Sequence, residues 1–169
     1  MYDFTLNTAD KPTLYRDLLA AADAVTAGEP DAVANMANVA ALLWQALPDV
    51  NWTGFYRMVP TTDGTDGTDD ELVLGPFQGK AACIRIALGK GVCGAAASSR
   101  ETQLVEDVHA FPGHIACDAD SRSELVVPVI TTDGKLKGVI DLDSPSPARF
   151  TQEDAVGIEA LAALIADRI

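Results

Sequence analysis

The sequence predicts an α+β fold with a central antiparallel sheet of about six strands, flanked by N-terminal and C-terminal helices. Two segments with the apolar spacing of helices come before any strand. The strands then follow one another in runs, which favours an antiparallel sheet over a regular alternation of strands and helices. A final segment begins with a helix-capping pattern. The chain has 169 residues, so a single domain over residues 1–169 is expected.

The three expected long helices each have recognisable boundaries. Apolar residues recur at helical spacing over residues 11–26, and Gly28-Glu-Pro30 ends that helix. Asp31 can cap a second amphipathic helix, which Pro48 closes. Thr151-Gln-Glu-Asp154 resembles a capping box, so the last helix is expected to begin there and to continue to about residue 167.

The expected strands are short and are separated by polar or glycine-rich segments. A loop rich in Asp, Gly and Thr, residues 61–70, follows the first strand. Thr131-Thr-Asp-Gly134 is a turn signal between the last two strands, which therefore form a hairpin. Residues 107–123 form a long irregular loop, and such loops are usually functional. The strands are expected at residues 50–59, 72–74, 82–87, 102–106, 125–130 and 136–142.

Charge and apolar pattern exclude several classes of partner. The formal net charge is −13, which repels nucleic-acid backbones and anionic lipid. No apolar run approaches the roughly 20 residues that span a bilayer. The first residues lack the basic and apolar regions of a signal peptide. We therefore expect a cytoplasmic protein that binds neither nucleic acid nor membranes.

Three cysteines, Cys83, Cys93 and Cys117, are the first candidates for chemistry. They include no Cys-x-x-Cys pair, which argues against a zinc ribbon and against a thioredoxin-like site. Cys117 lies in the irregular loop, where free backbone N–H groups could also bind an anion. Cys93 lies in a glycine-rich turn before a short helix, residues 95–99, whose N-terminus would lower the pKa of the thiol. Each cysteine by itself is also compatible with a buried structural thiol.

Acidic and aromatic residues form a second set of candidates. Asp141 and Asp143 lie on one face of the last strand, and Glu124 begins the other strand of that hairpin, from which it could face them. Carboxylates brought together in a pocket repel one another, so one can stay protonated near neutral pH and act as an acid. Trp52 and Tyr56 share a face of the first strand and could form an aromatic wall. The alternatives are surface charge at strand ends and ordinary core packing.

Three residues of the irregular loop are candidate metal ligands, namely His109, His114 and Cys117. Their spacing fits no common zinc pattern. We therefore expect no metal and no other cofactor, and a zinc-dependent hydrolase is kept only as an alternative.

Five motifs follow one another along the chain: Gly75-Pro-Phe-Gln-Gly-Lys80, Gly91-Val-Cys-Gly94, Asp107-Val-His-Ala-Phe-Pro-Gly-His-Ile-Ala-Cys-Asp118, Ser121-Arg-Ser-Glu124 and Gly138-Val-Ile-Asp-Leu-Asp-Ser-Pro145. In sequence and in order they resemble the motifs of the free methionine-R-sulfoxide reductases, which are small GAF-domain enzymes. The resemblance extends from about Lys11 to Ile165 and implies a GAF-type fold. The segment around Cys117 and the three-cysteine pattern are specific to that family.

This resemblance implies a role for each cysteine. Cys117 matches the catalytic nucleophile, which attacks the sulfoxide of free L-methionine-R-sulfoxide and becomes a sulfenic acid. Cys83 matches the cysteine that resolves the sulfenic acid to an intramolecular disulfide, which thioredoxin then reduces. Cys93 matches a third cysteine with an auxiliary or secondary resolving role. A homodimer is also implied.

The resemblance further implies a substrate pocket. Its acidic residues hold the ammonium and sulfoxide groups, its aromatic residues form a wall, and the backbone before the nucleophile holds the carboxylate. The alternative function is that of a non-catalytic GAF domain that senses a small molecule. The residues that match the pocket are Trp52, Tyr56, Ile115, Ala116, Glu124, Asp141 and Asp143.

Overall fold

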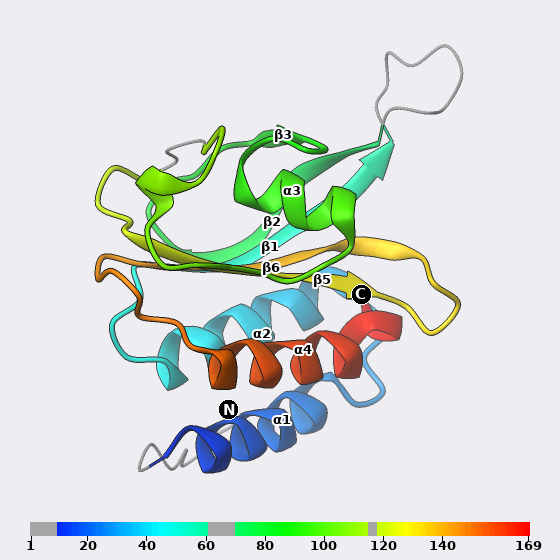
Figure 1. Ribbon diagram of the computed structural model, residues 1–169. Coiled ribbons are helices and arrows are strands. Elements are labelled where there is room, and N and C mark those ends of the chain that lie inside the picture. The colour runs from blue at the N-terminus through cyan, green and yellow to red at the C-terminus, as the bar shows by residue number, and fades with distance from the viewer. Residues whose placement is uncertain (1–9, 61–69, 115–117) are drawn as a thin grey trace.

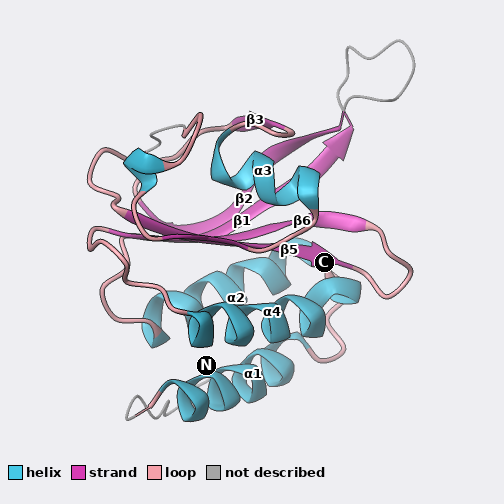
Figure 2. Cartoon of the chain, in the orientation of Figure 1, coloured by secondary structure: helices cyan, strands magenta, loops and turns pink. Residues whose placement is uncertain are grey.

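One six-stranded sheet organises the fold, with helices on both of its faces (Figure 1 and Figure 2). The computed structural model describes residues 10–60, 70–114 and 118–169. The strands are β1 (Trp52–Pro60), β2 (Asp70–Gly79), β3 (Arg85–Ala87), β4 (Gln103–Val105), β5 (Ser123–Ile130) and β6 (Leu136–Ser144). The helices are α1 (Lys11–Thr26), α2 (Ala32–Ala46), α3 (Gly91–Ser99) and α4 (Gln152–Ile165), with short 3₁₀ turns η1 (Val108–Ala110) and η2 (Ala166–Arg168).

The strands pair in the order β3-β2-β1-β6-β5-β4, and every neighbouring pair is antiparallel. The last strand of the chain, β6, therefore lies in the middle of the sheet between β1 and β5. The expected β5–β6 hairpin forms, and the Thr131 backbone N–H closes its turn on the carbonyl oxygen of Lys135 at 2.9 Å. This topology confirms the predicted α+β class with a six-stranded antiparallel sheet.

Capping residues begin the helices where the sequence indicates. Asp31 accepts the backbone N–H of Ala34 at 2.8 Å and so caps α2. At the start of α4, the backbone N–H of Thr151 donates to the carboxylate of Asp154 at 2.7 Å. Helix α4 ends at Ile165, and the last turn tightens into η2.

The bounds of three elements differ by three residues or more from the sequence prediction. Strand β2 is longer than expected because it continues through Gly75 and Pro76, which together oppose Phe55 in a bulge of the β1–β2 ladder. A bulge tolerates Pro76, which has no N–H to donate to a ladder. Strand β3 is shorter and begins only at Arg85. Helix α3 begins at Gly91, four residues before the expected start.

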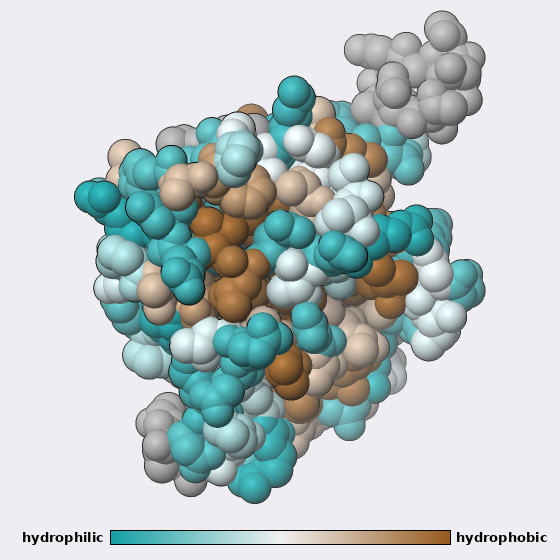
Figure 3. All heavy atoms as spheres, in the orientation of Figure 1, coloured by the Kyte–Doolittle hydropathy of each residue, from teal (hydrophilic) through white to brown (hydrophobic). Residues whose placement is uncertain are grey.

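Apolar side chains form a separate core on each face of the sheet. Helices α2 and α4 lie on one face, with α1 packed across them, and α3 lies on the other face (Figure 1). The core under α3 contains Trp52, Tyr56 and Cys93. Hydrophilic residues are spread over the outer surface in the view of Figure 3, with apolar residues gathered in smaller patches. None of the helices in the described part of the chain combines the length and apolar character of a membrane span.

Candidate active site

The candidate site lies between α3 and the sheet, where two strands bring three carboxyl groups together. Glu124 on β5 pairs directly with Asp143 on β6, and Asp141 lies two residues before Asp143 on the same strand. Residues two apart on a strand share a face. On the other side of β6, β1 places Trp52 opposite Asp143. The hairpin thus joins residues that are 17 to 19 positions apart in the chain (141 − 124 and 143 − 124).

Burial decides the electrostatics of these carboxyl groups. Glu124 and Asp141 are each only 6% exposed, which excludes surface charge as their environment. Burial, followed by the charges of Asp141 and Asp143, raises the pKa of Glu124 well above its usual value. Burial also raises the pKa of Asp141 to about 7 and that of Asp143 well above its ordinary value. Near neutral pH the cluster therefore contains both an acid and a base.

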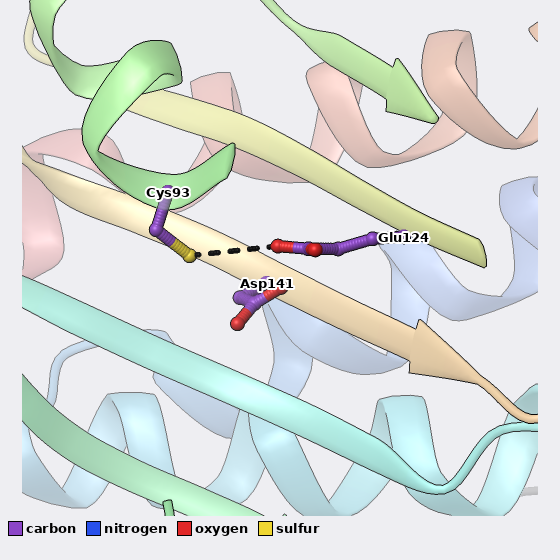
Figure 4. Close-up of side chains that lie close together, drawn as sticks. All are labelled: Cys93, Glu124 and Asp141. Atoms are coloured by element: carbon purple, nitrogen blue, oxygen red, sulfur yellow. Dashed lines mark hydrogen bonds between the residues drawn. The ribbon is translucent and has the colours of Figure 1, made fainter. Parts of the chain in front are cut away.

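Cys93 lies beside this cluster, in the first turn of α3. Its Sγ atom is 3.9 Å from Oε1 of Glu124 (Figure 4), and the side chain is a free thiol that is 4% exposed. The expected lowering of its pKa by the helix N-terminus is wrong. Burial and the nearby Asp141 and Glu124 raise the pKa of the Cys93 thiol well above its usual value. Desolvation of the thiolate outweighs the helix dipole here.

Close packing against β3 holds the helix that carries Cys93. A Cβ atom added to Gly94 would lie 2.5 Å from the carbonyl oxygen of Ala87, so a larger residue would push α3 away from the strand. The backbone N–H of Gly89 also donates to the carbonyl oxygen of Gly94 at 2.8 Å. Gly94 thus allows α3 to pack close to β3, with the Cys93 thiol beside the carboxyl groups.

The two aromatic candidates from β1 both lie on the α3 side of the sheet. Tyr56 lines the cavity and donates its hydroxyl hydrogen to the carbonyl oxygen of Cys83 at 3.0 Å. Trp52 stacks on Tyr56 with ring centroids 5.8 Å apart and on Phe77 at 5.2 Å. The described lining of the cavity includes Tyr56 but not Trp52, so Trp52 supports the wall from behind. Phe77 is a contribution that the sequence reasoning missed, although it lies in the Gly75–Lys80 motif.

Two residues of the irregular loop, His114 and Asp118, make polar contacts at the site. The ring Nδ1 of His114 lies 4.0 Å from Oε2 of Glu124, and burial lowers the pKa of this imidazole. Asp118 accepts a hydrogen bond from Asn51 at 3.3 Å and pairs with Lys80 at 3.3 Å. The backbone N–H of Asp120 and the ammonium of Lys80 lower the pKa of Asp118. These contacts from Asn51 and Lys80 were not expected from spacing.

The remaining candidates of the site are placed as follows. Cys83 is half-buried, disulfide-bonded and located before β3, so it does not begin that strand. Ile115, Ala116 and Cys117 lie outside the described residues. His109, a candidate metal ligand, is exposed and contacts Asp107 at 3.0 Å.

The cavity at the site is small, with a volume of about 30 Å³. It is also the place where titratable groups with raised pKa values converge, which is typical of an active site. A larger surface groove of about 610 Å³ lies along β4 and α4, but it contains no such cluster among the described residues. Size alone therefore does not locate the site. Its described lining is Tyr56, Ile86, Lys90, Gly91, Val92, Cys93, His114, Asp118, Ser121, Glu124, Asp141 and Asp143.

Comparison with known proteins agrees with the fold. Residues 34–169 match the GAF domain family. The free methionine-R-sulfoxide reductase of Escherichia coli is 47% identical over 154 residues, covering 91% of this chain and 87% of that protein. The enzyme of the same name from Saccharomyces cerevisiae is 44% identical over 168 residues, covering 97% and 88%.

A solved structure extends this similarity to three dimensions. The X-ray structure of the free methionine-R-sulfoxide reductase of Neisseria meningitidis, in complex with its substrate, superposes with a TM-score of 0.89 at 45% identity. The match covers 99% of this chain and 95% of that one. The chain therefore belongs to the GAF-domain family of free methionine-R-sulfoxide reductases, which are oxidoreductases.

Proposed function

We propose that this protein reduces free L-methionine-R-sulfoxide to L-methionine with the three cysteines and the buried carboxyl groups. The observation that carries the proposal is the cluster of Glu124, Asp141 and Asp143, because it supplies an acid and a carboxylate within one pocket. The similarity to reductases of that name, one of them solved with its substrate, supports the choice of substrate.

We propose that the pocket holds the substrate by both of its charged groups, the ammonium and the carboxylate. The ammonium group pairs with the carboxylate of Asp141, the carboxyl group of the cluster that ionises near neutral pH, and Tyr56 contacts the side chain of the substrate. The backbone at Ile115 and Ala116 binds the carboxylate.

The proposed reduction begins with the Cys117 thiolate. It attacks the sulfoxide sulfur, the S–O bond breaks, and the oxygen is transferred to the cysteine as a sulfenic acid while methionine leaves. The proton that this step consumes comes from Glu124, whose raised pKa keeps it protonated near neutral pH. The Cys83 thiol then condenses with the sulfenic acid, which releases water and forms a disulfide. A thioredoxin dithiol reduces this disulfide by exchange.

Two observations support Cys83 over Cys93 as the resolving thiol. Cys83 is disulfide-bonded and half-buried, whereas Cys93 is a free thiol packed in the core. A thiol whose pKa is raised by burial forms little thiolate and attacks slowly. The chain has three cysteines and Cys93 is free, so we assign Cys117 as the disulfide partner of Cys83. Cys93 keeps an auxiliary role in the pocket wall.

Turnover of free L-methionine-R-sulfoxide with thioredoxin and thioredoxin reductase tests this function. Cys117→Ser should abolish turnover because it removes the nucleophile. Cys83→Ser should still release about one equivalent of methionine per chain in a rapid-quench experiment but should lose recycling by thioredoxin. Wild-type activity in Cys117→Ser would refute the assignment. An inactive wild-type protein that binds a small molecule tightly would instead support the sensor function.

The proposal extends to organisation and location. We infer that residues 1–169 act as one GAF domain, that the protein works in the cytoplasm, and that two copies associate. Sedimentation velocity at micromolar concentration should show a dimer, and a monomer would contradict this part of the proposal alone.

A further inference from the structure

The most buried part of the pocket brings one thiol and two carboxyl groups together from three elements. Cys93 comes from α3, Glu124 from β5 and Asp141 from β6, and one ligand-type atom of each lies within 4.8 Å of the others. Figure 4 shows Cys93 and Glu124 pointing toward each other, with Asp141 beside their contact. All three side chains are more than nine-tenths buried. Groups that can all become anionic are costly to bury together without a cation.

Two unpartnered polar atoms are aimed at the same place. Oδ1 of Asp141 and Nδ1 of His114 are buried and have no hydrogen-bond partner among the described residues. Buried polar atoms are nearly always partnered in folded proteins, so each of these has an unused capacity to bind a ligand. Both residues line the cavity of about 30 Å³. A space of that size holds a single ion or water molecule.

We propose that Cys93, Glu124 and Asp141 form a binding site for a thiophilic divalent cation, with Zn²⁺ as the best match and His114 as a fourth ligand. Zinc takes tetrahedral sets of thiolate, imidazole and carboxylate ligands, and here one thiol and two carboxyl groups converge, with Nδ1 of His114 at 4.0 Å from Oε2 of Glu124. Magnesium and calcium prefer oxygen ligands throughout, so the thiol disfavours them.

The observed spacing is close to what zinc requires. With Zn–S and Zn–O bonds of about 2.3 and 2.0 Å, tetrahedral geometry separates a sulfur and an oxygen ligand by roughly 3.5 Å. The distance from Sγ of Cys93 to Oε1 of Glu124 is 3.9 Å. An approach of about 0.4 Å, well within side-chain adjustment, would bring both atoms into the first coordination sphere. The cation would also neutralise the charge that the buried cluster acquires on ionisation.

Metal and substrate would compete for this site. Glu124 and Asp141 are the carboxyl groups that the proposed function assigns to the substrate, so only one ligand can bind them at a time. This competition rests on the proposed function, whereas the metal site itself does not. Zinc would then inhibit the enzyme reversibly, and the degree of inhibition would follow the concentration of available zinc.

The experiment uses the full chain with Cys83→Ser and Cys117→Ser, so that Cys93 is the remaining thiol and the catalytic cysteines cannot bind the metal. Co²⁺ serves as the probe because its thiolate complexes absorb in the near ultraviolet. We expect one Co²⁺ per chain, a sulfur-to-cobalt charge-transfer band, and displacement by Zn²⁺. Adding Cys93→Ser should remove the band, and adding Asp141→Asn should weaken Co²⁺ binding at least about tenfold.

Asp118→Asn is the matched control. Asp118 lines the same cavity, but its carboxylate is already bound by Lys80 and Asn51, so its removal should leave the Co²⁺ affinity unchanged. Circular dichroism verifies the fold of every variant. A folded parent protein without the band, or a band that survives Cys93→Ser, would overturn the proposal.

Displacement of Co²⁺ by free methionine-R-sulfoxide tests the competition without any turnover. We expect the apparent Co²⁺ affinity to fall as the sulfoxide concentration rises. If Co²⁺ binds as proposed but the sulfoxide does not displace it, the placement of the substrate is wrong and the metal site stands.

Discussion

At the scale of single residues, the chemistry of this protein depends on two buried carboxyl groups, Glu124 and Asp141, and on the half-buried Asp143 beside them. Glu124 faces the thiol of Cys93 from α3, Asp141 and Asp143 from β6, and His114 from the loop. Because all lie in one cavity, ionisation of one group disfavours ionisation of the next, and the titrations belong to the cluster as a whole. The pair with the sharpest contrast is Glu124, held protonated, and Asp141, which titrates near pH 7.

The dependence of kcat on pH should report this contrast. Activity should rise as Asp141 ionises with a pKa of about 7 and should fall at higher pH as Glu124 loses its proton. Glu124→Gln cannot supply a proton, so its kcat should fall by about 100-fold or more and the alkaline limb should disappear. Steady-state kinetics between pH 5 and about 10 measure both effects. A wild-type kcat in Glu124→Gln would exclude Glu124 as the acid.

Glu124→Gln should also raise the thermal stability of the folded protein, because a buried Glu124 destabilises the fold when it ionises. The folded-state pKa of Glu124 lies above its unfolded value of 4.5. Its favourable contribution is therefore fully present below pH 4.5 and is lost as the pH rises toward the folded-state pKa. Glu124→Gln should accordingly unfold at a higher temperature than wild type at pH 8. An unchanged or lower Tm would contradict the burial argument.

Helix pairs determine stability at the scale of elements, and the contact between α1 and α4 is the clearest case. Asp154 is buried like Glu124, but it accepts the hydroxyl of Tyr15 at 2.8 Å and pairs with Lys11. Burial alone would raise the pKa of Asp154, yet Lys11, the Thr151 N–H, Tyr15 and Arg149 together outweigh burial and lower it. The presence of cationic and hydrogen-bonding partners therefore distinguishes Asp154, a structural carboxylate, from Glu124, a functional one.

Substitution of Gly157 should show how closely α1 and α4 pack. A Cβ atom at this position would lie 2.2 Å from the ring of Tyr15. Gly157→Ala should lower the free energy of unfolding by about 1–3 kcal/mol, even though alanine is the better helix former. Urea denaturation measures the change. Val156→Ala is the control, since Val156 is 56% exposed and its loss should cost within about 0.5 kcal/mol. Equal stability of both variants would mean that the helices can separate freely.

At the scale of the whole molecule, excess negative charge is the dominant electrostatic feature. The chain has 25 acidic and 12 basic residues, which gives the net charge of −13. Several basic residues are already paired, among them Lys80, Arg149 and Arg168. The remaining acidic groups repel one another across the surface and disfavour the compact state.

Added salt should therefore stabilise the protein. The Debye length falls from about 30 Å at 0.01 M salt to about 8 Å at 0.15 M, which screens repulsion across the surface. For a chain of this length, each kcal/mol of relieved repulsion should raise the Tm by about 2–4 °C. Thermal melts in NaCl measure the effect, and choline chloride controls for specific cation binding. A Tm that falls with salt would mean that surface ion pairs outweigh the repulsion.

Several features of the fold were predictable from local patterns. The helices at 11–26 and after Asp31 and Thr151 follow from apolar spacing and capping side chains, which act within a few residues. The β5–β6 hairpin follows from its turn, and it brings Glu124 opposite Asp143. The predicted bounds of β2 and α3 were wrong, because both depend on neighbouring strands. Strand β2 continues through a bulge opposite β1, and α3 begins where Gly94 packs against β3.

The sequence by itself determined the fold class, the hairpin that pairs the carboxyl groups, and the residues worth testing. Only the tertiary structure decided how those residues behave. The pKa of Cys93 is raised and not lowered, because folding buries the thiol and packs it against carboxyl groups that are 31 and 48 positions away in the chain (124 − 93 and 141 − 93). Burial depends on segments that meet only on folding, so the spacing of residues along the chain cannot reveal the environment of a buried group.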